Sequence, residues 1–279
     1  MARANLSFHQ TFKPERQFLS ILLAESDSCC GLDLLEISNL TGIPTGVSSG
    51  KVEPSMAYAE YMGLITKSRH VGKFEISCTP LGNCVKTEDP GLFEKLTLLA
   101  MHCMITRPWN GAALWSYIFQ VMFPKYHFRI TANQFAKEIE LQFGSGVKIA
   151  PFNGCYQDLF RPLRVLDFDD DNLSLSAQKI DPDFVYLYAF VLFTYWDEWL
   201  SNSSKDDSKM ASSEEITANH LKMIGFRNPF GWDERTEYHV LELMAANNLI
   251  ALNRQMIPFT LRRTTDLNFL LQMLYSELC

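Results

Sequence analysis

Apolar and polar positions between residues 31 and 85 alternate in a fixed order of helix-like and strand-like spacing. A first short helix is predicted to end at Gly42, because glycine readily takes the left-handed conformation that closes a helix. Pro54 fits the first turn of a second helix, where its missing N–H costs nothing. Phe74 and Ile76 then alternate on the return strand of a hairpin. Two short helices followed by a hairpin are typical of a winged helix-turn-helix, in which the hairpin is the wing.

The flanking patterns support this interpretation, and the end of the chain repeats it. Lys13-Pro14-Glu15 opens a supporting helix before the stretch, and Thr79-Pro80 begins another helix after it. Further along, Asp233 caps a helix, a turn follows over residues 253–255, and apolar residues alternate up to Leu261. We therefore expect a second winged-helix-like unit near the C-terminus. The alternative is an ordinary helical domain that carries a surface hairpin.

Two further signals place helices in the rest of the chain. Residues 184–200 are apolar on nearly all sides, but Asp197 and Glu198 interrupt them too soon for a bilayer span. We expect a buried central helix there and no membrane contact. Residues 130–135 read Ile-Thr-Ala-Asn-Gln-Phe, a capping box in which threonine and glutamine bond each other's backbone, and nearly the same string recurs over residues 216–221. So short a repeat can reflect shared capping chemistry alone.

Together the patterns predict a mainly α fold with small β-hairpin wings. The expected domains are a winged helix-turn-helix over residues 1–88, a helical middle domain with an acidic segment over 89–200, a serine-rich linker or exposed loop over 201–213, and a helical or winged-helix-like domain over 214–279. Residues 144–154 are glycine-rich but lack the spacing that cradles nucleotide phosphates, so we expect a loop there.

Composition adds the class of protein and its compartment. Of the 279 residues, 47% are apolar and 13% aromatic, which indicates a packed globular protein. The seven cysteines form no CxxC pair and no zinc-finger register, so we expect a reduced, cytoplasmic compartment and no structural zinc. The formal net charge of −7 is unfavourable for a nucleic-acid binder. Residues 161–220 hold twelve carboxylates and five Lys or Arg, however, so the acidity is local and the rest of the chain is neutral.

The winged-helix interpretation selects candidate DNA contacts. In this class of protein the second helix enters the major groove and the wing touches phosphates. The candidates are Lys51, Ser55 and Tyr58 on the second helix, Lys67, Arg69, His70 and Lys73 on the wing, and Arg254, Arg262 and Arg263 in the second unit. Glu53 and Glu60 on the same helix argue against DNA, and winged helices also dock proteins without nucleic acid. The sequence alone leaves both functions open.

Asp167, Asp169 and Asp171 belong to the densest acidic cluster of the chain. Carboxylates at this spacing can hold Mg²⁺ for phosphodiester cleavage, which would make Mg²⁺ a cofactor. The alternative is a solvated acidic turn, as most charge runs are. The sequence shows no HNH, HKD or PD-(D/E)xK nuclease pattern, so enzyme activity stays an open question and no metal ligands are assigned.

Three motifs give the chain a resemblance to a known family. They are His9-Gln10-Thr11-Phe12, residues 54–65 (PSMAYAEYMGLI) and residues 78–82 (CTPLG). On these motifs the chain resembles a bacterial domain family, first catalogued as being of unknown function, whose members include the SspB-like component of single-stranded DNA phosphorothioation and phage-defence operons. The resemblance covers the first half of the chain well and the second half loosely.

The resemblance implies DNA engagement in a system that replaces a non-bridging phosphate oxygen by sulfur, with this type of component associated with nicking. By that analogy alone, His9 and Arg16 are phosphate contacts or catalytic residues, and other proteins of the same defence operon are partners. Gln10 stands where the family has glutamate, which puts an acid/base role at that position in doubt. A second interpretation of His9 is that it pins the N-terminal segment by a hydrogen bond.

Three functions therefore compete. The first is a DNA-binding component of a phosphorothioation or phage-defence system, with or without nicking. The second is a transcriptional regulator built on tandem winged helices, which would form a homo-oligomer so that its reader helices meet successive half-sites. The third is a non-enzymatic adaptor that docks partner proteins. Duplex binding that weakens steeply with added salt would favour the first function over the third, because phosphate contacts release counterions.

Overall fold

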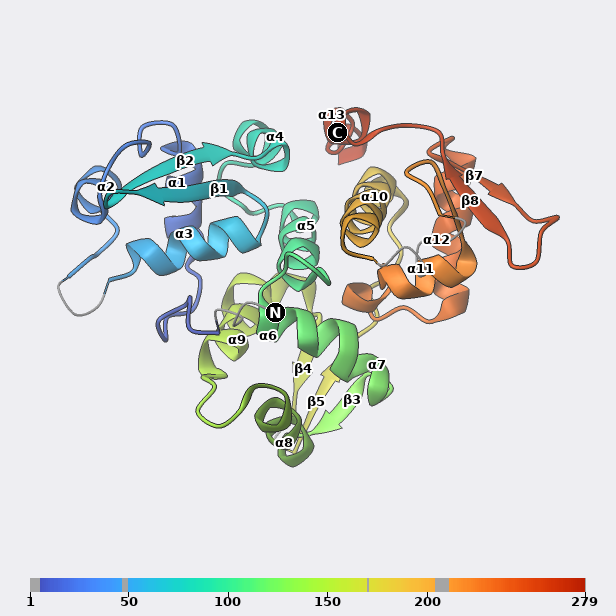
Figure 1. The fold of residues 1–279 in the computed structure, drawn as a ribbon, viewed down its shortest axis with the longest axis horizontal. Helices are drawn as coiled ribbons and strands as arrows, with labels where there is room; N and C mark the ends of the chain where they lie inside the picture. Colours follow the sequence, from blue (N-terminus) through green and yellow to red (C-terminus); the bar gives the residue numbers. More distant parts are fainter. Residues whose placement is uncertain (1–5, 47–49, 170, 204–210, 279) are drawn as a thin grey trace.

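The structure is a computed structural model that describes residues 6–46, 50–169, 171–203 and 211–278 (Figure 1). These residues are mainly helical and carry small antiparallel sheets, which confirms the predicted fold class at this level. The N-terminal elements are α1 (Arg16–Ala24), α2 (Leu34–Thr41), α3 (Val52–Tyr61), β1 (Ile65–His70), β2 (Lys73–Cys78) and α4 (Pro80–Glu88). The middle elements are α5 (Lys95–Thr106), α6 (Ala113–Tyr117), η1 (Ile118–Met122), α7 (Phe123–Lys125), β3 (Arg129–Thr131), α8 (Ala132–Phe143), α9 (Ala150–Gly154), η2 (Cys155–Leu159), η3 (Arg161–Leu163), β4 (Leu166–Phe168) and β5 (Asn172–Leu175). The last elements are η4 (Pro182–Phe184), α10 (Val185–Asn202), β6 (Glu215–Thr217), α11 (Ala218–Ile224), η5 (Asn228–Phe230), α12 (Glu234–Ala246), β7 (Ile250–Asn253), β8 (Thr260–Arg263), α13 (Leu267–Gln272) and η6 (Ser276–Leu278).

In the described part of the chain, one order of elements recurs three times: a helix, a first strand position, two helices and a hairpin. We call these the N-terminal unit (residues 16–88), the middle unit (residues 113–175) and the C-terminal unit (residues 185–263). The strand order is β3-β5-β4 in the middle unit and β6-β8-β7 in the C-terminal unit, so the last strand is central in both. In the N-terminal unit, the pairing of Leu32 with Phe74 on β2 takes the place of the first strand. Figure 1 shows the three hairpins at three corners of the molecule.

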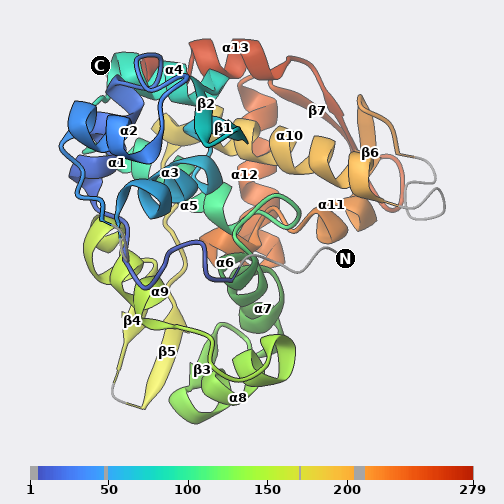
Figure 2. The same cartoon turned by 60° about the vertical axis from the view of Figure 1, so that its left-hand side comes forward.

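The middle unit is not predicted from the sequence, and its strands explain why. β3 and β4 have three residues each, which is too short for apolar alternation to stand out. The β4–β5 hairpin is seen in Figure 2. The described residues of the acidic stretch lie on this hairpin, where Asp167 pairs with Ser174. The glycine-rich segment is a loop over residues 144–149, as predicted, but its last five residues form helix α9.

The same capping chemistry follows the first strand position in every unit. Asp33, Thr131 and Thr217 each accept a hydrogen bond from the backbone N–H three residues on, and each forms a capping box. A capping box satisfies two backbone donors that the first helical turn leaves open. The similar strings at residues 130–135 and 216–221 therefore occupy equivalent structural positions.

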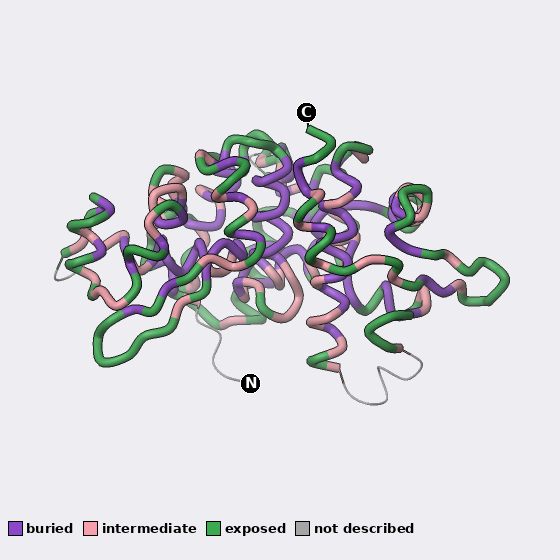
Figure 3. The backbone as a smooth tube through the Cα atoms, turned by 90° about the horizontal axis from the view of Figure 1, so that it is seen from above, coloured by how far each residue is buried: buried purple, intermediate pink, exposed green. Residues whose placement is uncertain are grey.

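Helices α5 and α10 lie at the centre of the molecule and join the three units (Figure 1). Buried backbone is concentrated in the middle of the molecule when it is seen from above (Figure 3). Every residue of α5 from Leu96 to Thr106 is buried. α10 packs against α5, α11, α12 and α13, as expected for a helix that is apolar on nearly all sides. Its Tyr195 donates a hydrogen bond to the Cys103 carbonyl of α5 at 2.5 Å, so the contact between the two helices is polar as well as apolar.

The CTPLG motif fixes the start of α4 against the end of α3. Thr79 caps α4 by accepting from the Gly82 N–H, and its hydroxyl donates to the Gly63 carbonyl at 2.5 Å. A side chain at position 82 would collide with the carbonyl oxygen of Leu64, so only glycine fits this close approach. The packing of α4 against the end of α3 thus explains the residues of the motif without any ligand.

The expected linker over residues 201–213 is described only in part. α10 continues into it as far as Asn202, and residues 204–210 lie outside the described residues. Pro124 sits in the short helix α7, and the helical turn before α7 widens into the π-helical η1. Among the described residues, no helix is long and apolar enough to cross a membrane.

Candidate nucleic-acid interface

Helix α3, the predicted DNA-reading helix, is buried along its middle. Ser55 and Tyr58 are 6% and 1% exposed, and the Tyr58 hydroxyl donates a hydrogen bond to the Phe12 carbonyl. α3 packs against α1, α2, α5 and β1. The prediction that Ser55 and Tyr58 contact DNA is therefore wrong, because the N-terminal segment and the neighbouring helices cover them. Lys51 stays half-exposed just before α3, where its ammonium lies 2.7 Å from the Glu15 carboxylate.

The β1–β2 hairpin carries four predicted phosphate contacts, and two of them already have partners. The pairs are Lys67 with Glu60, and Arg69 with Glu53 at 4.0 Å between Nη1 and Oε1. The two glutamates that argue against DNA on α3 thus compensate two of the hairpin's four predicted phosphate contacts. His70 and Lys73 lie opposite each other at the hairpin tip and are exposed, and their side chains make no hydrogen bond or ion pair with the described residues.

The three arginines predicted for the C-terminal unit have three different environments. Arg263 is 13% exposed, lies 2.8 Å from the Asp197 carboxylate and covers two aromatic rings of α10. It holds β8 onto α10 and donates to the Phe193 carbonyl, so most of its side chain is occupied by contacts within the protein. Arg254 is exposed but pairs with Glu242 at 2.7 Å. Arg262 is exposed and without a partner among the described residues.

His9 and Arg16, the two residues selected by resemblance, differ in accessibility. His9 is 1% exposed and packs near Trp115, its Nδ1 accepts a hydrogen bond from the Thr11 N–H, and burial lowers its pKa. This geometry fits a residue that pins the N-terminal segment. Arg16 is half-buried at the start of α1, with its guanidinium 4.7 Å from the centre of the Phe93 ring and its Nε lacking a partner among the described residues.

The acidic cluster does not assemble a metal site in the described residues. Asp167, Asp169 and Asp171 are all exposed along the β4–β5 hairpin, and Asp169 holds the turn through the amide of Asn172 at 3.4 Å. No group of three or more His, Cys, Asp or Glu side chains in the described ranges, which omit Asp170, is placed to hold a metal ion. A solvated turn is the interpretation that this geometry supports, and no chemical step through Mg²⁺ follows from it.

A groove with more cations than carboxylates runs along the junction of the N-terminal and middle units. It consists of two hollows of about 690 and 680 Å³ that share Gln157 and Arg161 in their walls. Its cations are Lys13, Arg16, Lys51, Arg161 and Arg164, and its carboxylates are Glu15, Asp158 and Asp167. We call this surface the basic groove. It brings together the predicted residues Arg16, Lys51 and Asp167 from three distant parts of the chain.

The charges of the basic groove are only partly compensated. Lys13 pairs with Asp158, a hydrogen bond that raises the pKa of the lysine. Arg161 and Arg164 are exposed and form no ion pair with the described residues, so their guanidinium groups are free to bind phosphate. Neither arginine stands out in the sequence, because both open the segment whose twelve carboxylates dominate its charge. The spacing of two arginines around Pro162, ahead of the aspartates, is the signal that could have revealed them.

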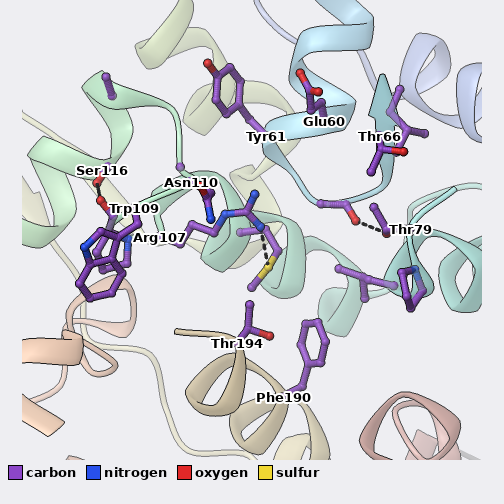
Figure 4. A pocket seen from close by; sticks show the side chains of 18 of the residues that line it. Glu60, Tyr61, Thr66, Thr79, Arg107, Trp109, Asn110, Ser116, Phe190 and Thr194 are labelled. Atoms are coloured by element: carbon purple, nitrogen blue, oxygen red, sulfur yellow. Dashed lines mark hydrogen bonds between the residues drawn. The ribbon is translucent and has the colours of Figure 1, made fainter. Parts of the chain in front are cut away.

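A larger cleft lies where the N-terminal unit meets α5, α6, α10 and α13, with a volume of about 1180 Å³ (Figure 4). Aromatic rings form much of its wall: Tyr61, Trp109, Tyr117, Phe143 and Phe190. Figure 4 shows Arg107 near the centre, with Tyr61 on one side and Thr194 and Phe190 on the other. We call this hollow the aromatic cleft. No residue predicted from the sequence as a site residue lines it.

The polar groups of the aromatic cleft are close to neutral in charge. Arg107 is 16% exposed, and its Nε lies 3.3 Å from a carboxylate oxygen of Glu198, itself 14% exposed. The Thr194 hydroxyl is buried without a hydrogen-bond partner among the described residues. Asn110 and Gln142 add exposed amides that bond to no described residue. Hydrogen-bond donors and hydrogen-bond acceptors thus both lie between the aromatic side chains of the cleft.

Comparison of the sequence with protein-family models and with curated proteins finds no match. Comparison with solved structures finds a crystal structure of SspB with a bound magnesium ion. The likeness covers 97% of this chain and 87% of that chain, with a TM-score of 0.66 and 15% sequence identity. At this identity the likeness shows a shared fold, and a shared fold does not fix a function.

Proposed function

We propose that the protein is a DNA-binding component of a bacterial DNA phosphorothioation or phage-defence system. The observation that carries the DNA-binding part is the basic groove, because it gathers uncompensated arginines on a protein whose net charge is −7. Affinity for DNA rests largely on cations that replace the counterions of phosphates. The assignment to this system is supported by the motifs at residues 9–12, 54–65 and 78–82 and by the fold shared with SspB.

We further propose that the three units are winged helices that bind DNA without inserting a helix into the major groove. Their order of elements suits this class, but α3 is covered at the residues that would face bases. Arg161 and Arg164 in the basic groove, with His70 and Lys73 at the hairpin tip, are then phosphate contacts. Phosphate contacts position a protein on DNA and carry no base sequence directly. Binding with little sequence preference is the expected outcome.

The test is duplex binding measured by fluorescence anisotropy over a range of salt concentrations. The wild-type protein should bind less tightly as salt rises, with a linear relation between the logarithms of affinity and salt concentration. The double variant Arg161→Gln/Arg164→Gln should lower the magnitude of that slope by about 1.8, because each lost phosphate contact removes about 0.9. Lys179→Gln is the matched control: Lys179 is exposed and lines neither hollow of the groove.

Two outcomes would contradict the proposal. A slope that the arginine double variant leaves unchanged would remove the basic groove from DNA binding. A wild-type protein that binds no duplex, yet retains partner proteins of its operon in co-purification, would establish the adaptor function instead. Dimers that bind one base sequence far more tightly than others would identify a regulator.

A further inference from the structure

We infer that the aromatic cleft binds unpaired nucleobases of a DNA strand. This inference rests on the proposed function and adds a second contact to it, separate from the phosphate-binding basic groove. The two surfaces share no lining residue. They also differ in chemistry, since one is cationic and the other is aromatic with nearly balanced charge.

The aromatic rings of the cleft suit stacking against bases. Phe8 packs behind Tyr61 with ring centres 4.7 Å apart, and Tyr117 meets Phe143 edge to face at 5.4 Å. These contacts hold both tyrosines in place at the wall of the cleft. Trp109 lies on the loop between α5 and α6 and is half-buried. Aromatic side chains that are fixed but not fully covered are the platforms on which unpaired bases stack in single-strand binding proteins.

The polar groups of the cleft suit the edges of bases more than a phosphate chain. Arg107 already faces Glu198, so its charge is compensated, while its planar group remains available for stacking or for donating to a base oxygen. Asn110 and Gln142 present amides, each of which has both donors and an acceptor for the edge of a base. The unpartnered Thr194 hydroxyl offers a further donor or acceptor. An uncompensated cation, which a phosphate would need, is absent from the described lining.

Size limits the ligand to a short stretch of strand. A pocket for one drug-sized ligand has a volume of about 300–1,000 Å³. The aromatic cleft, at about 1180 Å³, lies above that range. It therefore has room for more than one base, which a paired duplex cannot supply because its bases are stacked inside the helix. The ligand class is a single strand, or the unpaired part of an opened duplex.

The experiment uses the intrinsic fluorescence of the full-length protein with oligothymidylate as the probe. Four of the five tryptophans, Trp115, Trp196, Trp199 and Trp232, are at most 3% exposed, so contact quenching reports on Trp109. Oligothymidylate should quench the wild-type fluorescence. In an anisotropy assay, Trp109→Ala should lose about 5- to 150-fold in single-strand affinity, because stacking is worth about 1–3 kcal/mol per base. Thr194→Val should lose affinity by a smaller factor without altering the packing, since the two side chains have the same shape.

Trp109→Phe and Phe269→Ala separate stacking from general effects on the protein. Trp109→Phe keeps an aromatic ring, so it should retain most of the affinity while losing the fluorescence signal. Phe269 is 41% exposed on α13 beside the cleft but does not line it, so Phe269→Ala should leave single-strand affinity unchanged. Equal single-strand affinity in Trp109→Ala and the wild type would overturn the inference, as would a peptide that quenches Trp109 where oligothymidylate does not.

The inference and the proposed function can fail separately. If duplex DNA binds through Arg161 and Arg164 while oligothymidylate leaves Trp109 unquenched, only the inference about the aromatic cleft falls. If the protein binds neither duplex nor single-stranded DNA, both the proposed function and the inference about the aromatic cleft are wrong. Duplex affinity that is the same in Trp109→Ala and the wild type, together with lost single-strand affinity, would establish two separate surfaces.

Discussion

The N-terminal and C-terminal units share one order of elements but expose different parts of it. In the N-terminal unit the third helix, α3, is covered, and the side chains of His70 and Lys73 at the hairpin tip have no partner among the described residues. In the C-terminal unit the third helix, α12, has an exposed face, and Arg254 and Arg263 both have carboxylate partners. The same topology therefore covers the third helix at one end of the molecule and exposes it at the other, while Arg262 is the one predicted arginine of the C-terminal unit with no ion pair to a described residue.

This difference shows that the neighbours of a unit, more than its topology, decide which of its surfaces can bind. α3 is enclosed because the N-terminal segment and α5 lie against it. α12 packs with one side on α10 and leaves Glu234, Arg235 and His239 in solvent. Its first turn carries two glutamates, which is unfavourable for a helix that would enter a DNA groove.

The largest expected effect compares a tyrosine on each third helix. Tyr58→Ala removes a fully buried ring from α3 and should destabilise the protein by about 3–5 kcal/mol, as large-to-small core substitutions of aromatic residues do. Tyr238→Ala on α12 removes a half-buried ring and should cost clearly less. Chemical denaturation of both variants measures the two values. Equal costs would mean that the two helices are equally buried in solution.

The next effect is a pH dependence that belongs to the C-terminal unit. Burial raises the pKa of Glu237 on α12 from 4.5 to about 7, although Arg227 lies 3.5 Å away. A carboxyl group whose pKa is raised on folding favours the folded state below pH 4.5, and that contribution is lost as pH rises through about 7. The free energy of unfolding should fall by up to about 3 kcal/mol over this window relative to Glu237→Gln. Denaturation at several pH values checks this, and parallel pH profiles for the two proteins would exclude it.

A smaller effect compares one cation on each hairpin. Lys73→Gln should lower the magnitude of the salt-dependence slope of duplex binding by about 0.9, the value for one phosphate contact. Arg254→Gln should leave the slope unchanged, because Glu242 already compensates that arginine. The anisotropy titration described for the basic groove measures both slopes. A larger change in Arg254→Gln than in Lys73→Gln would reverse the assignment of the two hairpins.

The smallest expected effect tests whether the N-caps of the N-terminal and C-terminal units contribute equally to stability. Asp33→Ala and Thr217→Ala each remove an N-cap from the helix after the first strand position, and each should cost about 1 kcal/mol. Asp33 should cost slightly more at neutral pH, because its carboxylate also interacts with the helix dipole. Thermal unfolding measures both. A negligible loss at either position would mean that its cap is not formed in solution.

The local features of the fold could be predicted from the sequence, whereas contacts between distant residues could not. The sequence indicates Thr79, Thr131 and Asp233 as caps, because capping depends only on residues within one turn. The three-stranded sheet of the middle unit was missed, since its strands are too short to show a period. Burial of α3 was also missed, because it depends on segments that no local pattern connects to it.

The candidate site was predictable to the same limited extent. Arg16, Lys51 and Asp167 were selected singly, for unrelated reasons, and only the fold shows that they line one groove. Lys13 meets Asp158 across 145 positions of the chain, a contact that spacing cannot suggest. The aromatic cleft had no sequence signal at all, because its rings come from five different elements or loops and each looks like an ordinary core residue.

The regular spacing of the three sheets has a consequence for how the chain folds. Leu32 pairs with Phe74, Ile130 with Leu173 and Ile216 with Leu261, so each sheet closes a loop of about 40 residues. The entropy lost on closing a loop depends only weakly on its length, so the three closures cost nearly the same. Topology therefore favours no unit over the others in the order of folding. The unit whose helices form most readily on their own should fold first and nucleate the folding of the other two.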